Sequence, residues 1–437
     1  MLWVTSGLRA GKSSRADQIQ LPNLFSKVRP EPGSDRPLFA IDISRQTKQD
    51  AYELGETICV AALEVKLDAY IVPDDHKVYK CFPGKAYRFY ELIRDENAIF
   101  LDILGLDTLD SDSARWTRQQ ITDTIRSDRQ QRETEMIARG RTPPRRTGYS
   151  KTGYSRTDRR DTTFAIGLYQ TAKQGDLIVV PAEGYQRDVL IGELLDAPGK
   201  LVEVTAKDSD GNTLKYMGRR VRWLGRQPKR LFPEELIQLL HSQTAFFDIG
   251  RRFYETMYEI AYENFTFGDV FVASFKTSKQ HFTSRDNLIV SVWFEALSAI
   301  RDAVESGDTD FLKNSSFFEI AVAAQASTES ELSININSPG EFILRSTKEF
   351  ALVAMTIFAM AVAQPTAADA QNVHVNAKVV GSASTECLGK IDESVKRYIE
   401  ALGAKGWREA CKTAVEARDS ATLKTEAHLK SPTATSN

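Results

Sequence analysis

The sequence predicts a multidomain α+β protein. The chain has 437 residues, of which 42% are hydrophobic and 9% aromatic, so it holds enough apolar material for several cores. Segments with helical hydrophobic spacing alternate with short apolar strands that end at Gly, Pro, Asp or Asn. Four cysteines in a chain of this length exclude a small fold held together by disulfides.

Residues 1–78 are expected to form an N-terminal α/β segment. An apolar strand is predicted over residues 38–43, and a helix over residues 46–69, where apolar residues recur every three or four positions. Glu64 and Lys66 have the spacing of half a nuclease metal site, which requires a strand. Because both fall in the predicted helix, the sequence favours a solvated helix face there, and a nuclease stays as an alternative.

A phosphate-binding loop is suggested by residues 7–13, which read Gly-Leu-Arg-Ala-Gly-Lys-Ser. Ser6 occupies the position of the first glycine of that motif, and Pro22 interrupts the helix that should follow. The sequence therefore favours a basic, glycine-containing segment over nucleotide hydrolysis.

Residues 79–240 are expected to form a β-rich domain with a disordered basic insertion at residues 139–162. The insertion is rich in Arg, Thr, Gly and Ser and cannot bury enough apolar surface to offset its ordering entropy. The other elements predicted here are a helix ending near Arg94, a strand at 98–103, a polar helix at 110–140, strands at 177–180, 189–194 and 219–224, and a helix from Pro233 to Leu240.

Three short stretches occur in a distinctive order in this domain. They are Gly-Asp-Leu-Ile-Val-Val-Pro at 175–181, Ile-Gly-Glu at 191–193 and Val-Arg-Trp at 221–223. Together with Lys-Ala-Tyr-Arg-Phe-Tyr at 85–90 and the strand from Ala98, they resemble the PUA/EVE-like superfamily, as found in modification-dependent restriction and bacterial defence proteins. The resemblance covers about residues 80–240, and it implies a small curved β-barrel with flanking helices.

The resemblance also implies a function. Such domains bind RNA or flipped modified bases in a concave pocket and carry no chemistry of their own. A flipped base is held by aromatic stacking, while basic groups anchor phosphates. The alternative is that the aromatic residues are core and the arginines line a solvated strand edge. The candidate ligand-binding residues are Tyr87, Arg88, Tyr90, Tyr185, Arg219, Arg220, Arg222 and Trp223.

The charge is distributed unevenly. The net charge is −2, but residues 115–160 hold thirteen Lys and Arg against five Asp and Glu, which leaves −10 for the rest. Such a basic stretch is typical of a segment that binds nucleic acid independently of sequence. The alternative interpretation is a linker that only increases solubility. The candidate residues for the nucleic-acid backbone are Arg139, Arg141, Arg145, Arg146, Lys151 and Arg156.

Residues 241–345 are expected to form a second α+β domain. Helices are predicted at 246–265 and 288–304, and strands at 270–275, 317–325 and 331–337.

The hydrophobic helix predicted at residues 346–370 contains fourteen residues, 350–363, of which only Thr356 is polar. Two interpretations stay open. The run is either a buried core helix or a membrane segment, and in the second case Arg345 and Lys348 would keep residues 1–349 in the cytoplasm. Residues 371–437 are expected to form a helical tail with a helix at 391–418. If the tail lay in an oxidising compartment, Cys387 and Cys411 could form a disulfide there.

No catalytic residue, metal site or cofactor is predicted, because the five His are scattered and no Cys-x-x-Cys pair occurs. The sequence therefore predicts a non-catalytic sensor of nucleic acid, a modified base or a nucleotide in bacterial antiviral defence. It would be cytoplasmic or anchored to the inner membrane through 350–363, and would form a homo-oligomer or bind a partner protein of its defence system. The alternative is a membrane-anchored effector or scaffold that acts through protein–protein contacts.

Overall fold

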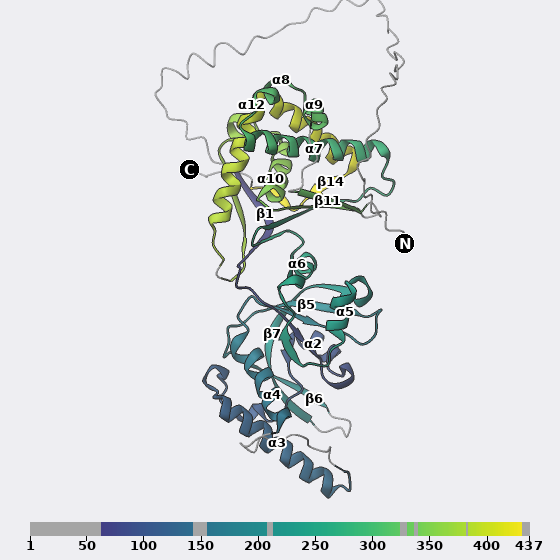
Figure 1. Ribbon diagram of the computed structural model, residues 1–437, viewed down its shortest axis with the longest axis vertical. Coiled ribbons are helices and arrows are strands. Elements are labelled where there is room, and N and C mark those ends of the chain that lie inside the picture. Colours follow the sequence, from purple (N-terminus) through teal and green to yellow (C-terminus); the bar gives the residue numbers. More distant parts are fainter. Residues whose placement is uncertain are drawn as a thin grey trace, which may run out of the picture. The chain divides into compact units, whose positions relative to one another are not determined.

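The computed structural model describes residues 63–142, 155–207, 213–323, 330–335, 340–381 and 383–430. The described residues lie in one compact unit that begins at Val60. Two β-sheets and their helices make up this unit (Figure 1), so the expected α+β class is confirmed. The predicted strand at 38–43, the motif at 7–13 and Cys59 lie outside the described residues.

The larger sheet combines distant parts of the chain. Its strand order is β11-β12-β10-β9-β1-β13, with β14 paired to β10 and β15 paired to β1. Strand β1 runs parallel to β9 and to β13. The strands are β1 (Leu63–Val72), β9 (Phe265–Phe267), β10 (Val270–Thr277), β11 (Ser330–Asn335), β12 (Gly340–Ser346), β13 (Val373–Val379), β14 (Leu423–Thr425) and β15 (Ala427–Leu429).

One sheet is thus built from three of the expected domains, 1–78, 241–345 and 371–437, and these boundaries do not separate independent sheets. Helices α7 (Ser284–Ser306), α8 (Asp310–Asn314), α9 (Phe317–Ala323), α10 (Phe350–Ala363), α11 (Ala367–Ala370) and α12 (Glu386–Ala421) accompany it.

Helix α10 is the apolar run seen in the sequence, and it lies inside this part of the molecule. It contacts β1, β10 and β12 as well as α7 and α12, so it is enclosed between the sheet and the other helices. Every residue from Phe350 to Ala361 is buried. The membrane interpretation is therefore not supported. Among the described residues, no helix combines the length and the apolar character needed to cross a bilayer.

The second sheet has the strand order β3-β7-β5-β4-β2-β8, and β6 also pairs with β7. The long strand β7 pairs with β3 and β6 through its first half and with β5 through its second half. The strands are β2 (Val78–Cys81), β3 (Ala98–Phe100), β4 (Leu177–Val180), β5 (Asp188–Leu194), β6 (Val202–Lys207), β7 (Thr213–Pro228) and β8 (Phe246–Asp248).

Short helical elements connect and flank these strands. The α-helices are α2 (Tyr90–Glu96), α3 (Arg118–Ala138), α4 (Arg156–Ile166), α5 (Glu234–His241) and α6 (Tyr254–Tyr262). The shorter turns are η1 (Lys85–Tyr87), η2 (Leu106–Thr108), η3 (Ser113–Arg115), η4 (Gly167–Thr171), η5 (Lys229–Leu231) and η6 (Arg251–Phe253).

Some predicted elements are wrong. Residues 63–69 are strand rather than helix, because Val65, Leu67 and Ala69 alternate inward with polar residues between them. The predicted strand at 317–325 is helix α9 over its described residues. The predicted helix at 246–265 contains β8 and the shorter α6.

The basic insertion is also shorter than expected. Its residues 156–162 belong to helix α4, which Ser155 caps through a capping box with Asp158. Residues 143–154 lie outside the described part of the chain. The proposed disulfide is wrong as well. Cys387 and Cys411 are both free thiols, and they lie before and after the kink that Gly403 introduces into α12.

Candidate functional site

Arg219, a predicted ligand-binding residue, is a structural residue. Its side chain is fully buried, and its guanidinium donates to the backbone carbonyls of Leu168, Ala172 and Asp196. Burial lowers its pKa to about 10. Because these three bonds use donors of the guanidinium inside the fold, the contacts favour a structural role for Arg219 over the predicted ligand-binding role.

The other predicted arginines of this set lie on the surface in ion pairs. Arg220 donates to both carboxylate oxygens of Asp196, at 2.7 and 2.6 Å. Arg222 donates to Glu193 at 2.6 Å, and Arg88 to Asp102 at 2.5 Å. Arg220 and Arg222 lie two positions apart on β7, whereas Arg88 lies beside η1.

Two predicted aromatic residues pack inside the second sheet's domain. Tyr90 is buried, and its hydroxyl donates to the carbonyl of Asp188 at 2.8 Å. Trp223 is half-buried against the core, and its indole nitrogen donates to the carbonyl of Arg94 at 3.1 Å. These contacts agree with the core alternative for both residues.

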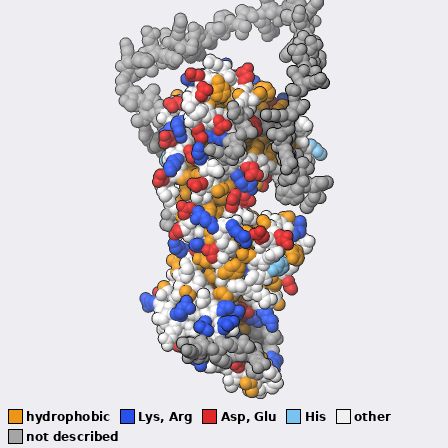
Figure 2. Space-filling view, in the orientation of Figure 1, with side chains coloured by type: hydrophobic (Ala, Val, Ile, Leu, Met, Phe, Trp, Pro, Cys, Tyr) orange, Lys and Arg blue, Asp and Glu red, His pale blue; other side chains and the backbone are white. Residues whose placement is uncertain are grey.

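Of the predicted backbone-binding residues, Arg139, Arg141 and Arg156 are exposed. Arg145, Arg146 and Lys151 lie outside the described residues. Lys and Arg side chains gather over the lower part of the face shown in Figure 2, the part of the molecule that holds α3 and α4. Arg156, Arg159 and Arg160 on α4 are exposed there, so a basic surface is present beside the second sheet.

The two remaining predicted residues, Tyr87 and Tyr185, lie at a site that the sequence did not reveal. Their neighbours are two lysines and a histidine from distant segments. The ring of Tyr87 lies 5.3 Å from the Lys229 Nζ, and the ring of Tyr185 lies 5.1 Å from the ring of His241. We call the group Lys80, Lys229, His241, Tyr87 and Tyr185 the lysine cluster.

Five segments position the lysine cluster. Lys80 comes from β2, Tyr87 from the turn η1, Lys229 from η5 and His241 from the end of α5, whereas Tyr185 belongs to the exposed loop 183–187. Backbone hydrogen bonds from Lys229 to Arg187 and from Arg230 to Tyr185 hold this loop against η5. The left-handed backbone of Tyr87, with φ of 56°, turns the η1 segment beside them.

Both lysines of the cluster are completely buried. Lys80 donates to the carbonyl of Ser242, and Lys229 donates to the carbonyl of Ala182. The Lys80 Nζ also lies 5.2 Å from the ring of Phe82 and 5.3 Å from that of Phe247. An ammonium group can donate three hydrogen bonds, so in the described part of the chain each lysine uses one donor and has no carboxylate within ion-pair distance.

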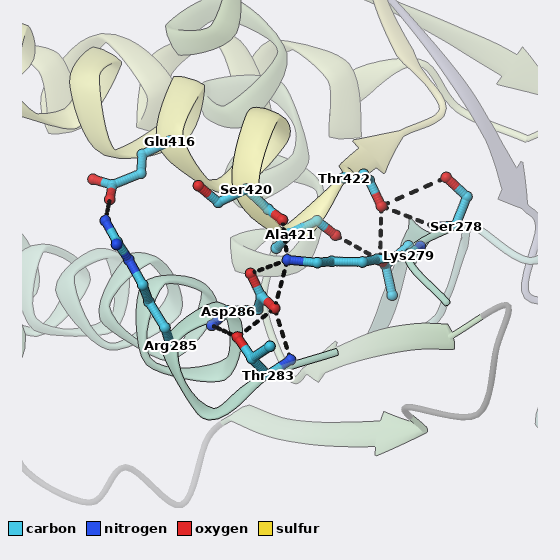
Figure 3. A network of polar contacts seen from close by, with 10 residues as sticks. Ser278, Lys279, Thr283, Arg285, Asp286, Glu416, Ser420, Ala421 and Thr422 are labelled. Carbon is cyan, nitrogen blue, oxygen red and sulfur yellow. Dashed lines mark hydrogen bonds and ion pairs between the residues drawn. The ribbon is translucent and has the colours of Figure 1, made fainter. Parts of the chain in front are cut away.

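A third lysine shows how this chain satisfies a lysine that serves the fold. The Lys279 Nζ donates to both carboxylate oxygens of the buried Asp286 and to the carbonyl of Ser420, each at 2.7 Å (Figure 3). These bonds connect the start of α7 to the end of α12. All three donors of Lys279 are used and its charge is neutralised, whereas Lys80 and Lys229 lack both kinds of compensation.

The pKa values of the cluster's lysines are shifted because they are buried without a carboxylate partner among the described residues. Burial lowers the pKa of Lys80 to about 8, and the charge of Lys229 adds to the effect. Burial likewise lowers the pKa of Lys229, against a weaker opposing influence of the exposed Glu183. The pKa of His241 is lowered by burial and then by the two lysines. Within the described ranges of the chain, the buried His241 Nε2 has no hydrogen-bond partner.

A bound anion would compensate this arrangement. It would accept hydrogen bonds from the unused ammonium donors and neutralise two buried charges that no described carboxylate pairs with. The sequence could not reveal the site, because lysines are usually exposed and these two are far apart in the chain. The only signal was the presence of Tyr87 and Tyr185 among the predicted aromatic residues.

Glu64 and Lys66 lie on a strand, as a nuclease metal site would require, but the described residues around them do not form such a site. Glu64 and Lys66 lie on β1, and the Glu64 carboxylate accepts hydrogen bonds from Asn376 at 2.6 Å and Lys430 at 2.9 Å. Across the described residues, no three His, Cys, Asp or Glu side chains gather as metal ligands. No step of hydrolysis can be derived from these contacts.

Comparisons with known proteins give no match, whether with family models, curated proteins or solved structures. The functional argument therefore rests on the geometry of the lysine cluster and on the basic surface beside it.

Proposed function

We propose that this protein is a non-catalytic sensor that binds a nucleic acid or nucleotide through the lysine cluster, as a component of bacterial antiviral defence. The observation that carries the proposal is the pair of buried ammonium groups, Lys80 and Lys229, which have no carboxylate partner among the residues that the structure describes. A buried charge without compensation costs folding free energy, so its retention points to an anionic ligand.

The rest of the site supports a nucleic-acid ligand among anions. The Tyr185 side chain is 55% exposed beside His241 and offers an aromatic face on which a base can stack. The basic surface of α4 can contact phosphates further along a strand. The resemblance of residues 80–240 to PUA/EVE-like domains agrees with this proposal.

The test compares binding of a mixed-sequence single-stranded RNA and the matching DNA to the wild type and to a Lys80→Met, Lys229→Met variant. We expect the variant to bind at least tenfold more weakly, because two charge-assisted contacts are lost. Fluorescence anisotropy over a range of salt concentrations should also show a shallower salt dependence for the variant.

A Lys200→Met, Lys215→Met variant is the matched control, since it removes the same charge from exposed positions. It should keep nearly wild-type affinity. Thermal unfolding of the cluster variant separates function from structure. We expect its melting temperature to match or exceed that of the wild type, because methionine is buried more cheaply than an uncompensated ammonium. Unchanged affinity in the cluster variant would contradict the proposal.

A further inference from the structure

We propose that this chain binds an alkyl carboxylate, an apolar chain that ends in an anionic group, in a cavity between helix α12 and the turn that joins α10 to α11. The cavity has a volume of about 570 Å³. Small-molecule sites in proteins typically occupy about 300–1,000 Å³. The cavity shares no lining residue with the lysine cluster, so this inference does not depend on the proposed function.

One wall of the cavity is a single face of α12. Its lining residues recur every three or four positions, so they lie side by side along the helix. Burial raises the pKa of the Cys411 thiol to about 11, so at neutral pH this group is uncharged and adds to the apolar surface. Four of the six residues on this face are apolar and two are cationic. They are Ala404, Trp407, Arg408, Cys411, Lys412 and Val415.

The opposite wall is the turn after α10, which includes Pro365 and Ala367. Gln364 ends α10 in the left-handed conformation, with φ of 57°, and Pro365 cannot continue the helix. The Trp407 indole nitrogen donates to the carbonyl of Pro365 at 3.0 Å and connects the two walls. This bond uses the one polar atom of the Trp407 side chain, so the rest of its ring contributes apolar surface.

Two cations determine the sign of the ligand's charge. Arg408 and Lys412 are exposed, line the cavity and lie one turn apart on α12. Arg408 donates to the carbonyl of Ala404 at 3.3 Å, and neither cation forms an ion pair with a described carboxylate. No Asp or Glu is among the lining residues. Asp369, in the neighbouring helix α11, accepts a hydrogen bond from Thr366 at 2.6 Å. An anionic group would therefore be the counter-ion of both cations.

The apolar walls and the two cations together define an amphipathic ligand. Inorganic phosphate or a nucleotide would pair with the cations but would leave the apolar walls unmatched. A neutral hydrocarbon would bury apolar surface but would leave the cations without a counter-ion. An alkyl chain with a carboxylate at one end matches both features.

The experiment uses the full chain and four probes that separate the effect of charge from that of the alkyl chain. The probes are octanoate, octanol, octyltrimethylammonium and acetate, each used below the concentration at which it forms micelles. Calorimetry measures their affinities for the wild type, for Arg408→Gln, Lys412→Gln and for the control Lys396→Gln, Lys405→Gln. The control removes the same charge from exposed positions of α12 that do not line the cavity.

We expect octanoate to bind the wild type at least tenfold more tightly than octanol or octyltrimethylammonium, because it alone can pair with both cations. Acetate should bind at least a hundredfold more weakly than octanoate, because it has little apolar surface to bury. The Arg408→Gln, Lys412→Gln variant should bind octanoate no better than octanol, and the control should match the wild type.

Equal affinity of the wild type for octanoate and octanol would overturn the inference, because the cavity would then accept any apolar group, including the helix of a partner protein. The absence of octanoate binding, or an equal loss of binding in both variants, would also overturn it. None of these results bears on the proposed function, which depends on the lysine cluster. The comparison of probes on the wild type needs no variant to fold.

Discussion

At the scale of single residues, Arg219 and Lys80 use a buried positive charge in different ways. Arg219 donates to three backbone carbonyls, so it connects the segments around Leu168, Ala172 and Asp196. Lys80 makes one such bond and has unused donors. Arg219 uses its donors to stabilise the fold, whereas Lys80 keeps donors that no described residue occupies, as the proposed function requires.

Replacing Arg219 with leucine should therefore destabilise the protein. Three buried carbonyl oxygens would lose a donor, and each unsatisfied group costs about 1–3 kcal/mol, so the free energy of unfolding should fall by about 3 kcal/mol or more. Urea denaturation measures the loss. Arg226→Leu is the control, because its exposed ion pair with Asp188 should contribute little. If Arg219→Leu kept full stability but lost ligand binding, Arg219 would be a ligand-binding residue after all.

At the scale of elements, helix α10 is the centre of the larger core. Thirteen of its fourteen residues are apolar, and the sheet on one side and α7 and α12 on the other enclose it. Its only polar residue, Thr356, donates to the carbonyl of Leu352 at 2.8 Å, so no polar group of its side chains is left unpaired.

Leu352→Ala tests this placement. Leu352 is fully buried, and truncation of a buried leucine typically costs about 2–5 kcal/mol because a cavity remains. The variant should unfold at a clearly lower urea concentration than the wild type. Val322→Ala, at a well exposed position on α9, should change little. A near-neutral Leu352→Ala would mean that α10 does not pack in a core.

The elements that the sequence predicted correctly are those with a local signal. The run Leu177–Val180 is apolar and bounded by turns, and α7 starts at the capping box of Thr283 and Asp286. Strand β1 was mistaken for helix because the helical spacing before it continues into its first residues. Helix α9 was mistaken for a strand because Phe317–Ala323 is short and apolar, and only its packing against α7 and α12 decides between the two.

The candidate site was predictable only in part. Tyr87 and Tyr185 were predicted as ligand-binding residues because they are aromatic residues near the resembling motifs. Lys80 and Lys229 could not be found, since their burial depends on the pairing of β2 with β8 and on the fold of η5. Long-range pairing of this kind leaves no periodic signal in a sequence.

At the scale of the whole molecule, ligand binding should depend on pH. The lysine cluster attracts an anion only while its lysines are charged, and burial lowers the pKa of Lys80 to about 8. Without ligand the sign for stability is the opposite. The pKa of Lys80 is about 8 in the folded chain and 10.5 in the unfolded chain. Between these pH values the unfolded chain binds more protons, so the contribution of Lys80 to the free energy of unfolding increases as the pH rises.

We therefore expect affinity for a single-stranded RNA to fall by up to roughly tenfold between pH 7 and pH 9, as the charged fraction of Lys80 decreases. Calorimetry at several pH values measures the trend. The Lys80→Met variant should show a much flatter profile, and a wild-type affinity that rises with pH would be incompatible with a charged Lys80 in the site.

The most direct test of the lysine cluster is to locate the bound nucleic acid. A single-stranded RNA that contains 4-thiouridine, bound to the full chain and irradiated, will crosslink to the residues beside its modified base. Mass spectrometry of the digested complex should place crosslinks in the peptides that contain Tyr185 and Tyr87. Crosslinks confined to α3 and α4, with none near Tyr185, would contradict the central claim and assign binding to the basic surface alone.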